Sequence, residues 1–273
     1  MEPRIRVVGL GIRPVLGNWA VHESVDYRTI DSSTELIDVD SQRQVIIDAC
    51  EAAPATEATA NKICRAVEKG CYVAVQPTDH GLLAAFDKVN LYATNRVFFF
   101  IPMLYRPVCL ELMRLLAEKH LGPPAGIESS FALGADETLY GPLALLYLLV
   151  TDPRGKTIVW RQGENNAVTG LIWSDSRAAT FCCYYDEKGA NSRVSVACKR
   201  GTIIGTLGRA DCLFAAPAGE TPYHLPLPEG NGLYYFQIDM IQGAQAGSPS
   251  VVLPSVVGRR ALRWIQEIIN EGT

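Results

Sequence analysis

The chain has 273 residues, 48% of them hydrophobic and 20% charged, which is the composition of a globular protein with one large or two medium domains. Its formal net charge is −4 and its Lys and Arg residues are scattered, which argues against a nucleic-acid-binding face. No stretch approaches the ~20 apolar residues that span a bilayer. Since the first residues run straight into a strand, we expect a cytoplasmic protein with no signal peptide and no membrane contact.

The first hundred residues alternate between predicted strands and helices. An apolar run over 5–10 predicts the first strand, and it ends in the glycine turn Gly9-Leu10-Gly11, which is typical of dinucleotide-binding units. A second strand over 25–30 ends at Asp31, twenty residues after Gly11, which is the usual distance to the acid that binds a ribose hydroxyl. Because helices predicted over 56–69 and 80–90 alternate with strands over 45–49, 71–75 and 96–101, we expect a parallel sheet wound by right-handed crossovers.

The pattern changes after a helix predicted over 107–120. Runs rich in β-formers follow at 158–162, 168–174, 178–185 and 193–199, separated by Gly, Asn and Asp turns, and they predict antiparallel meander strands. Apolar and amphipathic patterns predict helices over 139–150 and 255–270. The predicted fold is α/β: a truncated Rossmann-like parallel-sheet domain over 1–103, then an α+β domain over 104–273 with a large open, mostly antiparallel sheet.

The eight cysteines and four histidines lack the spacing of a metal site or of a nucleophile motif. No two cysteines form a C-x-x-C pair, and no His lies at ligand spacing from another ligand. The chain has no G-x-S-x-G turn and no glycine-rich phosphate loop with its Lys. We therefore expect reduced, buried thiols and no metal, and acyl transfer, phosphoryl transfer and metal hydrolysis are unsupported.

The segment 66–77 reads as the end of a helix, a turn, a buried strand and a proline. It resembles the "aleaGkhVlvEKP" segment of the glucose–fructose oxidoreductase / inositol dehydrogenase (Gfo/Idh/MocA) family. Similar matches are found for 33–54, for 96–107 with its Tyr105-Arg106-Pro107, for 122–129, for 199–203 and for the C-terminal stretch 236–269. The resemblance implies a nicotinamide-dependent oxidoreductase scaffold in which Gly9, Gly11 and Asp31 would bind NAD(P).

Several positions depart from the family's pattern. The family's catalytic Lys before the proline is Gln76 here, and an amide can serve as neither general acid nor general base. Pro14 falls near the third glycine of the loop and removes a possible phosphate donor. About one βα unit is missing between 31 and 46. The Asp and His of the family's D-x-G-x-H motif become Leu139 and Leu143, which leaves Gly141.

We expect a site where the carboxyl ends of the first domain's strands would face the second domain's sheet. Three residues are the catalytic candidates: Gln76, His80 as a general acid or base, and Tyr140 as a proton donor or oxyanion ligand. Tyr105, Arg106, Asp136 and Glu137 are the substrate-binding candidates. The structural alternatives are a solvated His80 near a helix start, a half-buried Tyr140, an ion pair for Arg106 and helix capping for Asp136 and Glu137.

Three functions follow from this set. The first is a small-molecule enzyme without cofactor that catalyses a redox-neutral cyclisation, isomerisation or elimination in biosynthesis. The second is an atypical NAD(P)-dependent oxidoreductase, and the third is a non-catalytic partner subunit. The resemblance implies a homo-oligomer formed through the open sheet. Trp173, Phe181 and Cys183 alternate with Ile172 and Cys182, so we expect both faces of that sheet to be apolar, one on helices and one on a partner.

Overall fold

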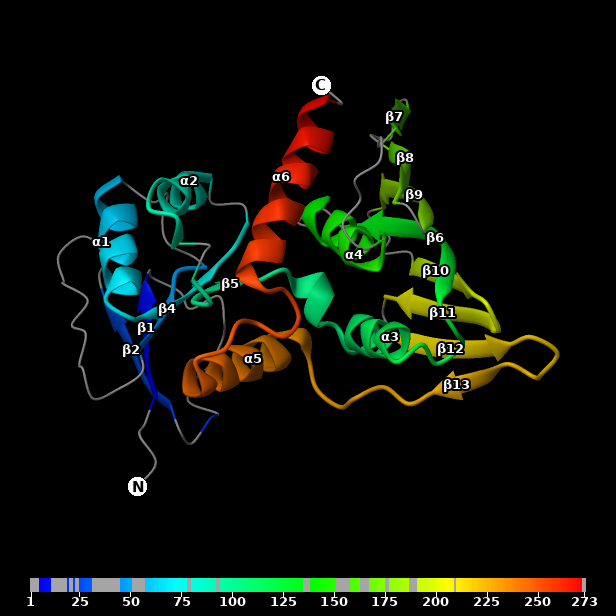
Figure 1. Cartoon of the computed structure of the whole chain (residues 1–273), viewed down its shortest axis with the longest axis horizontal. Helices are drawn as coiled ribbons and strands as arrows, with labels where there is room; N and C mark the ends of the chain where they lie inside the picture. Colours follow the sequence, from blue (N-terminus) through cyan, green and yellow to red (C-terminus); the bar gives the residue numbers. More distant parts are fainter. Residues whose placement is uncertain are drawn as a thin grey trace. The chain divides into compact units, whose positions relative to one another are not determined.

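The computed structural model (Figure 1) divides into two compact units. The first comprises Met1–Ile101 with Leu233–Arg260, and the second Pro102–Gly232 with Ala261–Thr273. The structure describes residues 5–10, 19, 22, 25–30, 45–50, 57–77, 80–91, 94–134, 138–150, 158–162, 167–174, 177–186, 191–208 and 210–271.

A five-stranded sheet forms the centre of the first unit, and its strands are all parallel, in the order β2-β1-β3-β4-β5. The strands are β1 (Ile5–Leu10), β2 (Val25–Ile30), β3 (Val45–Asp48), β4 (Tyr72–Val75) and β5 (Val97–Phe99). The chain moves from β1 to β2 on one side and returns to β3 on the other, so the strand order reverses between β1 and β3. That reversal makes a topological switch point, where Gly9 of β1 is in register with Asp48 of β3.

Helices cover both faces of this sheet. Figure 1 shows α1 (Glu57–Glu68) and α2 (His80–Lys88) on one side of the strands and α5 (Gly232–Ala246) on the other. Phe98 and Phe100 both contact α5: a Cβ on Gly243 would come within 2.6 Å of the Phe98 ring, and the Phe100 and Phe236 rings are 4.9 Å apart. The segment 233–260 therefore belongs to the core of the first unit, whereas the predicted boundary placed everything after residue 103 in the second domain.

The second unit contains an eight-stranded sheet in the order β13-β12-β11-β10-β6-β9-β8-β7. Neighbouring strands are antiparallel except β6 and β9, which are parallel, so the predicted fold class, a mostly antiparallel second sheet included, is confirmed. The strands are β6 (Pro124–Leu133), β7 (Ile158–Gln162), β8 (Ala167–Trp173), β9 (Ala178–Tyr185), β10 (Ser192–Cys198), β11 (Gly201–Leu207), β12 (Cys212–Pro217) and β13 (Tyr223–Leu225). The helical elements of this unit are η3 (Pro102–Tyr105), α3 (Pro107–Ala117), α4 (Tyr140–Val150) and the end of α6 (Ser255–Glu271).

The two faces of the large sheet differ in chemistry. Phe181 and Cys183 of β9 are buried, together with Ile172 of β8. The opposite face is mixed, because one cross-strand row of partly exposed residues runs Leu171, Thr180, Glu128, Ser195, Ile204 and Phe214. The prediction of two apolar faces is therefore wrong at the centre of the sheet. Strand alternation places Trp173 on the mixed face and Phe181 on the buried one. The partner-subunit function loses its expected support, and the homo-oligomer stays a prediction.

Candidate functional site

Gln76 lies at the carboxyl edge of the parallel sheet, directly after the fully buried strand β4. The backbone at this point is fixed, because the Phe100 N–H donates to the Val75 carbonyl at 2.8 Å and Pro77 is buried. The side chain of Gln76 itself is half-buried. An amide held at this edge can bind a substrate through its carbonyl and its N–H groups, but it can neither release nor accept a proton at neutral pH.

Trp19 and Asp48 meet at the switch point. The Trp19 side chain is fully buried, and its indole N–H donates to Asp48 Oδ2 at 3.1 Å. The other carboxyl oxygen of Asp48 accepts from the Cys50 backbone N–H at 3.3 Å, and Asp48 is 3% exposed. Sequence reasoning missed this pair. The available signal is an acidic residue within the otherwise apolar run 45–49, a pattern that marks a buried polar group needing a partner.

Of the other residues expected at a nicotinamide site, only some are described by the structure. Gly9 is buried in β1 between β2 and β3, within the strand and before the predicted turn, and its role in binding a cofactor stays a prediction. Gly11 and Asp31 lie outside the described residues. His80 is the first residue of α2, so the predicted helix start is confirmed, but its side chain lies outside the described part of the chain. Asp136 and Glu137 also fall outside it.

Tyr140 is the first residue of α4 in the second unit. Burial raises the pKa of its hydroxyl, and the hydrogen bond with the Gln266 side chain lowers that pKa by less. The hydroxyl therefore keeps its proton at neutral pH and is suited to donate a hydrogen bond. The next residue, Gly141, lets α4 approach η3 closely, since a Cβ there would lie 3.1 Å from Met103 Cβ. This packing gives the retained glycine a structural role.

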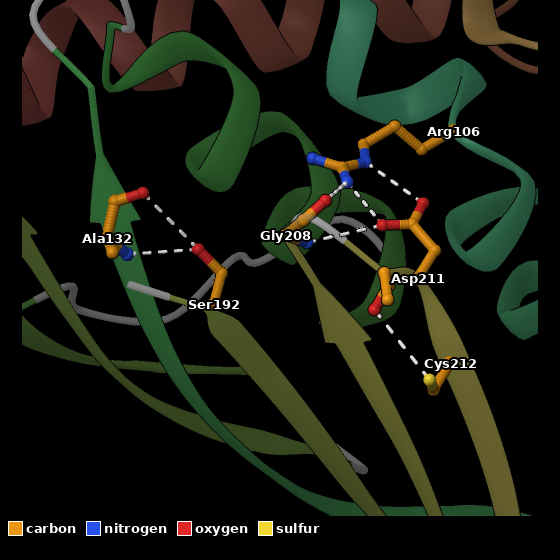
Figure 2. A network of polar contacts seen from close by, with 7 residues as sticks. Arg106, Ala132, Ser192, Gly208, Asp211 and Cys212 are labelled. Atoms are coloured by element: carbon orange, nitrogen blue, oxygen red, sulfur yellow. Dashed lines mark hydrogen bonds and ion pairs between the residues drawn. The ribbon is translucent and has the colours of Figure 1, made fainter. Parts of the chain in front are cut away.

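Tyr105 and Arg106, which were expected to bind substrate, are held within the second unit. The Tyr105 side chain is fully buried in η3. Figure 2 shows the Arg106 guanidinium between Asp211 and the Gly208 carbonyl. Its Nε donates to Asp211 Oδ2 at 3.1 Å, Nη2 donates to Gly208 O at 2.9 Å, and Nη2 also contacts Asp211 Oδ1. The geometry supports the ion-pair alternative for Arg106. This ion pair connects the turn between β11 and β12 to the start of α3.

We expect a double-mutant cycle with Arg106→Met and Asp211→Asn to give a coupling energy of about 1–2 kcal/mol, because the pair is bidentate and half-buried. Urea unfolding of the four proteins measures it. The exposed pair Arg114–Glu118 is the matched control and should show a smaller coupling. A coupling for Arg106–Asp211 no larger than the control would contradict the structural role.

The described part of the chain, which includes all eight cysteines, holds no group of three metal-ligating side chains. None of the eight cysteines forms a disulfide, and five of them are buried. Burial raises the pKa of Cys71 to about 11 and that of Cys109 to about 12, and it also raises the pKa of Cys64 and Cys183. These groups are packing residues, not nucleophiles.

Alkylation with iodoacetamide at about pH 8 should therefore label the half-exposed Cys182 and Cys212 first. A raised pKa leaves less thiolate at this pH, and thiolate is the reactive form, so Cys71 and Cys109 should stay unmodified in the native protein. Peptide mapping by mass spectrometry reads out the order, with urea-unfolded protein as the control in which all eight react. Native Cys109 labelled as fast as Cys182 would overturn this order.

Neither a protein-family model nor a curated protein matches this sequence. Solved structures do match. An oxidoreductase from Agrobacterium radiobacter in complex with NAD+, L-tartaric acid and magnesium superposes with a TM-score of 0.74 at 9% identity, over 98% of this chain and 96% of that one. The aldose-aldose oxidoreductase from Caulobacter crescentus gives 0.69 at 12% identity (98% and 97% covered). The UDP-N-acetylglucosamine 3-dehydrogenase from Acidithiobacillus ferrooxidans gives 0.67 at 14% (97% and 96%).

The chain has the fold of these oxidoreductases. The match extends over nearly all of both chains, so the scaffold that the sequence resemblance implied is confirmed. Identities of 9–14% establish the fold, whereas chemistry depends on the residues of the site. Among the described residues, no helix is long and apolar enough to cross a membrane.

Proposed function

We propose that this protein is a small-molecule enzyme that uses an oxidoreductase scaffold for a redox-neutral step: a cyclisation, isomerisation or elimination. The observation that carries the proposal is Gln76. It occupies the position at the end of β4 where the family resemblance implies a catalytic Lys, and its amide cannot exchange a proton with a reacting hydroxyl. A dehydrogenase that oxidises an alcohol needs a base at that point, whereas binding and orienting a substrate needs only an amide.

The loop 11–18 lies outside the described residues, and the residues that are described at the switch point place a carboxyl group there, which disfavours the diphosphate of a nicotinamide dinucleotide. An anion at such a turn is held by backbone and side-chain N–H donors. Here the Trp19 indole and the Cys50 backbone N–H both donate to Asp48, whose carboxyl group lies on the strand next to Gly9. For this reason no hydride step is assigned to the site, and the degenerate cofactor site stays part of the proposal.

In this proposal the protein accelerates the reaction by binding the substrate and by holding hydrogen-bonding groups in place around it. The Gln76 amide offers both an acceptor and donors from a fixed backbone, and such groups orient a flexible substrate toward one reactive conformation. Tyr140 keeps its proton and is the proposed proton donor or oxyanion ligand. Preorganised hydrogen bonds of this kind stabilise charge in a transition state without an electron carrier.

The second candidate is an atypical NAD(P)-dependent oxidoreductase. It is favoured by the full-length match to oxidoreductases, one of which is described in complex with NAD+. This function would have to place the nicotinamide without the usual proton-transfer Lys, and it would need a reorganised switch point.

The two candidates are separated by proton exchange, in which His80, the first residue of α2, is the proposed base that accepts the substrate proton and returns a proton to it. We expect the protein, in D2O without added nicotinamide, to catalyse deuterium incorporation into, or isomerisation of, at least one member of a panel of ketoses, aldoses and polyols followed by proton NMR. Gln76→Ala should lower the rate by about 10–100-fold through lost orientation, and Gln76→Lys should not introduce nicotinamide reduction. Turnover that requires NAD(P)+ and releases the reduced cofactor would contradict the proposal.

A further inference from the structure

The helix α4 is held at both of its ends by contacts within the second unit. At its start, a Cβ on Gly141 would lie 3.1 Å from Met103 Cβ, so this turn packs closely on η3. At its end, Arg177 Nη1 donates to the Leu149 carbonyl at 2.7 Å. The backbone of Tyr140, the first residue of α4, therefore has a set position in this unit.

Two side-chain contacts connect α4 to α6. The Tyr140 hydroxyl forms a hydrogen bond with the Gln266 side chain, and the rings of Tyr147 and Trp264 have centroids 5.6 Å apart. Tyr140 and Tyr147 are about two helical turns apart, so they lie on the same side of α4. Tyr140 is 9% exposed and Gln266 is half-buried, so water competes little for their hydrogen bond.

The polarity of this hydrogen bond decides where the Tyr140 proton points. A phenol oxygen can accept a hydrogen bond while its O–H donates elsewhere, and a glutamine amide can take either role. The contact lowers the pKa of Tyr140, as an N–H that faces the oxygen does because it stabilises the phenolate. With the Gln266 N–H on one side of the oxygen, the O–H stays available for a second acceptor, such as an oxygen atom of a bound substrate.

From this arrangement we infer that Gln266 is a positioning residue for the reaction: its side-chain amide holds the Tyr140 hydroxyl so that the O–H is directed at an oxygen of the substrate. This inference rests on the proposed function, in which Tyr140 is the proton donor or oxyanion ligand. The substrate that such a hydroxyl fits carries a carbonyl or hydroxyl oxygen on or beside the reacting carbon.

The test uses two variants of nearly the same size as glutamine. Gln266→Met removes the donor, whereas Gln266→Glu places an acceptor at the same point. Carbon NMR of protein labelled at tyrosine Cζ measures the Tyr140 pKa, and Tyr140→Phe assigns the signal. We expect both variants to raise this pKa, Gln266→Glu more, because a carboxylate disfavours the phenolate. Glu267→Gln, at the next and exposed position of α6, is the matched control and should keep the wild-type value.

The same variants in the deuterium-incorporation assay separate positioning from folding. We expect Gln266→Met to lower kcat about 5–20-fold with KM changed less than about twofold. Gln266→Glu should lower kcat as far as Tyr140→Phe does, because its acceptor takes up the O–H. An unchanged Tyr140 pKa in Gln266→Met, or a wild-type kcat for Gln266→Glu, would overturn the inference. No turnover of any member of the panel would instead overturn the proposed function, and the NMR measurement would still decide whether Gln266 holds the hydroxyl.

Discussion

Replacing Gly201 with Ala is expected to lower the free energy of unfolding by about 3–5 kcal/mol. Gly201 is the first residue of β11 and has a φ of +148°, a backbone conformation that L side chains rarely adopt. An added Cβ would come within 2.7 Å of Pro217 Cα and would meet the Ala216 carbonyl oxygen. Both atoms belong to the backbone of the neighbouring strand β12, so relief requires moving a strand instead of rotating a side chain.

Gly219 is the matched control for this substitution. It also has a positive φ, of +81°, but a Cβ there would meet no atom within 4 Å. Gly219→Ala should therefore show only the backbone strain of about 1 kcal/mol. Chemical denaturation monitored by circular dichroism measures both variants. Equal losses for the two glycines would show that the contact with β12 contributes nothing.

Trp19→Ala is expected to cost about 3–5 kcal/mol of unfolding free energy. The side chain is fully buried, so its removal leaves a cavity, and the Asp48 carboxyl group loses the indole donor. Because Trp19 precedes β2 and Asp48 ends β3, the contact joins the two halves of the sheet at the switch point. The loss should therefore affect the first unit as a whole.

Trp19→Phe separates the two contributions. Phenylalanine retains most of the apolar volume and lacks the N–H, so it should cost about 1–3 kcal/mol, most of it from the unpaired carboxyl oxygen. Urea denaturation of the two variants gives the comparison. If Trp19→Ala destabilises by less than about 1 kcal/mol, the Trp19 side chain does not pack beside Asp48 as described.

Much of the fold follows from local patterns. Buried apolar runs ending in a glycine turn or a proline gave β1 and β4, and alternation of strand and helix predicted the parallel pairing seen in the structure. The strand and helix pattern could not assign α5 to the first unit, because nothing in the local sequence around Gly243 indicates that it packs against the Phe98 ring. Only the contact of Gly243 with Phe98, made across a long separation in sequence, places that helix in the first unit.

The sheet of the second unit shows the same limit. The predicted antiparallel runs are present, but no strand was predicted over β6, which joins the two antiparallel groups through its parallel pairing with β9. Gly126 and two prolines at the start of β6 weaken the local strand signal. Pairing with β9 and β10 on both sides outweighs that propensity.

The position of a candidate site residue was predictable where it follows from the local sequence. It was not predictable where it depends on a partner far away in the sequence. Gln76 was identified from the sequence, and the structure places it at the strand edge as expected. Arg106 was ambiguous because Asp211, its ion-pair partner, is 105 residues away. Trp19 and Asp48 are 29 residues apart in the sequence and meet at the switch point, so no local motif indicates their contact.

The most direct test of the central claim is titration of the purified wild-type protein with NADH and NADPH, followed by the fluorescence of the reduced nicotinamide. The account predicts no binding up to millimolar concentration, because the Asp48 carboxyl group, described at the switch point beside Gly9, disfavours the diphosphate. Binding at micromolar strength, about 8 kcal/mol, would contradict it and would restore the oxidoreductase as the function of this chain.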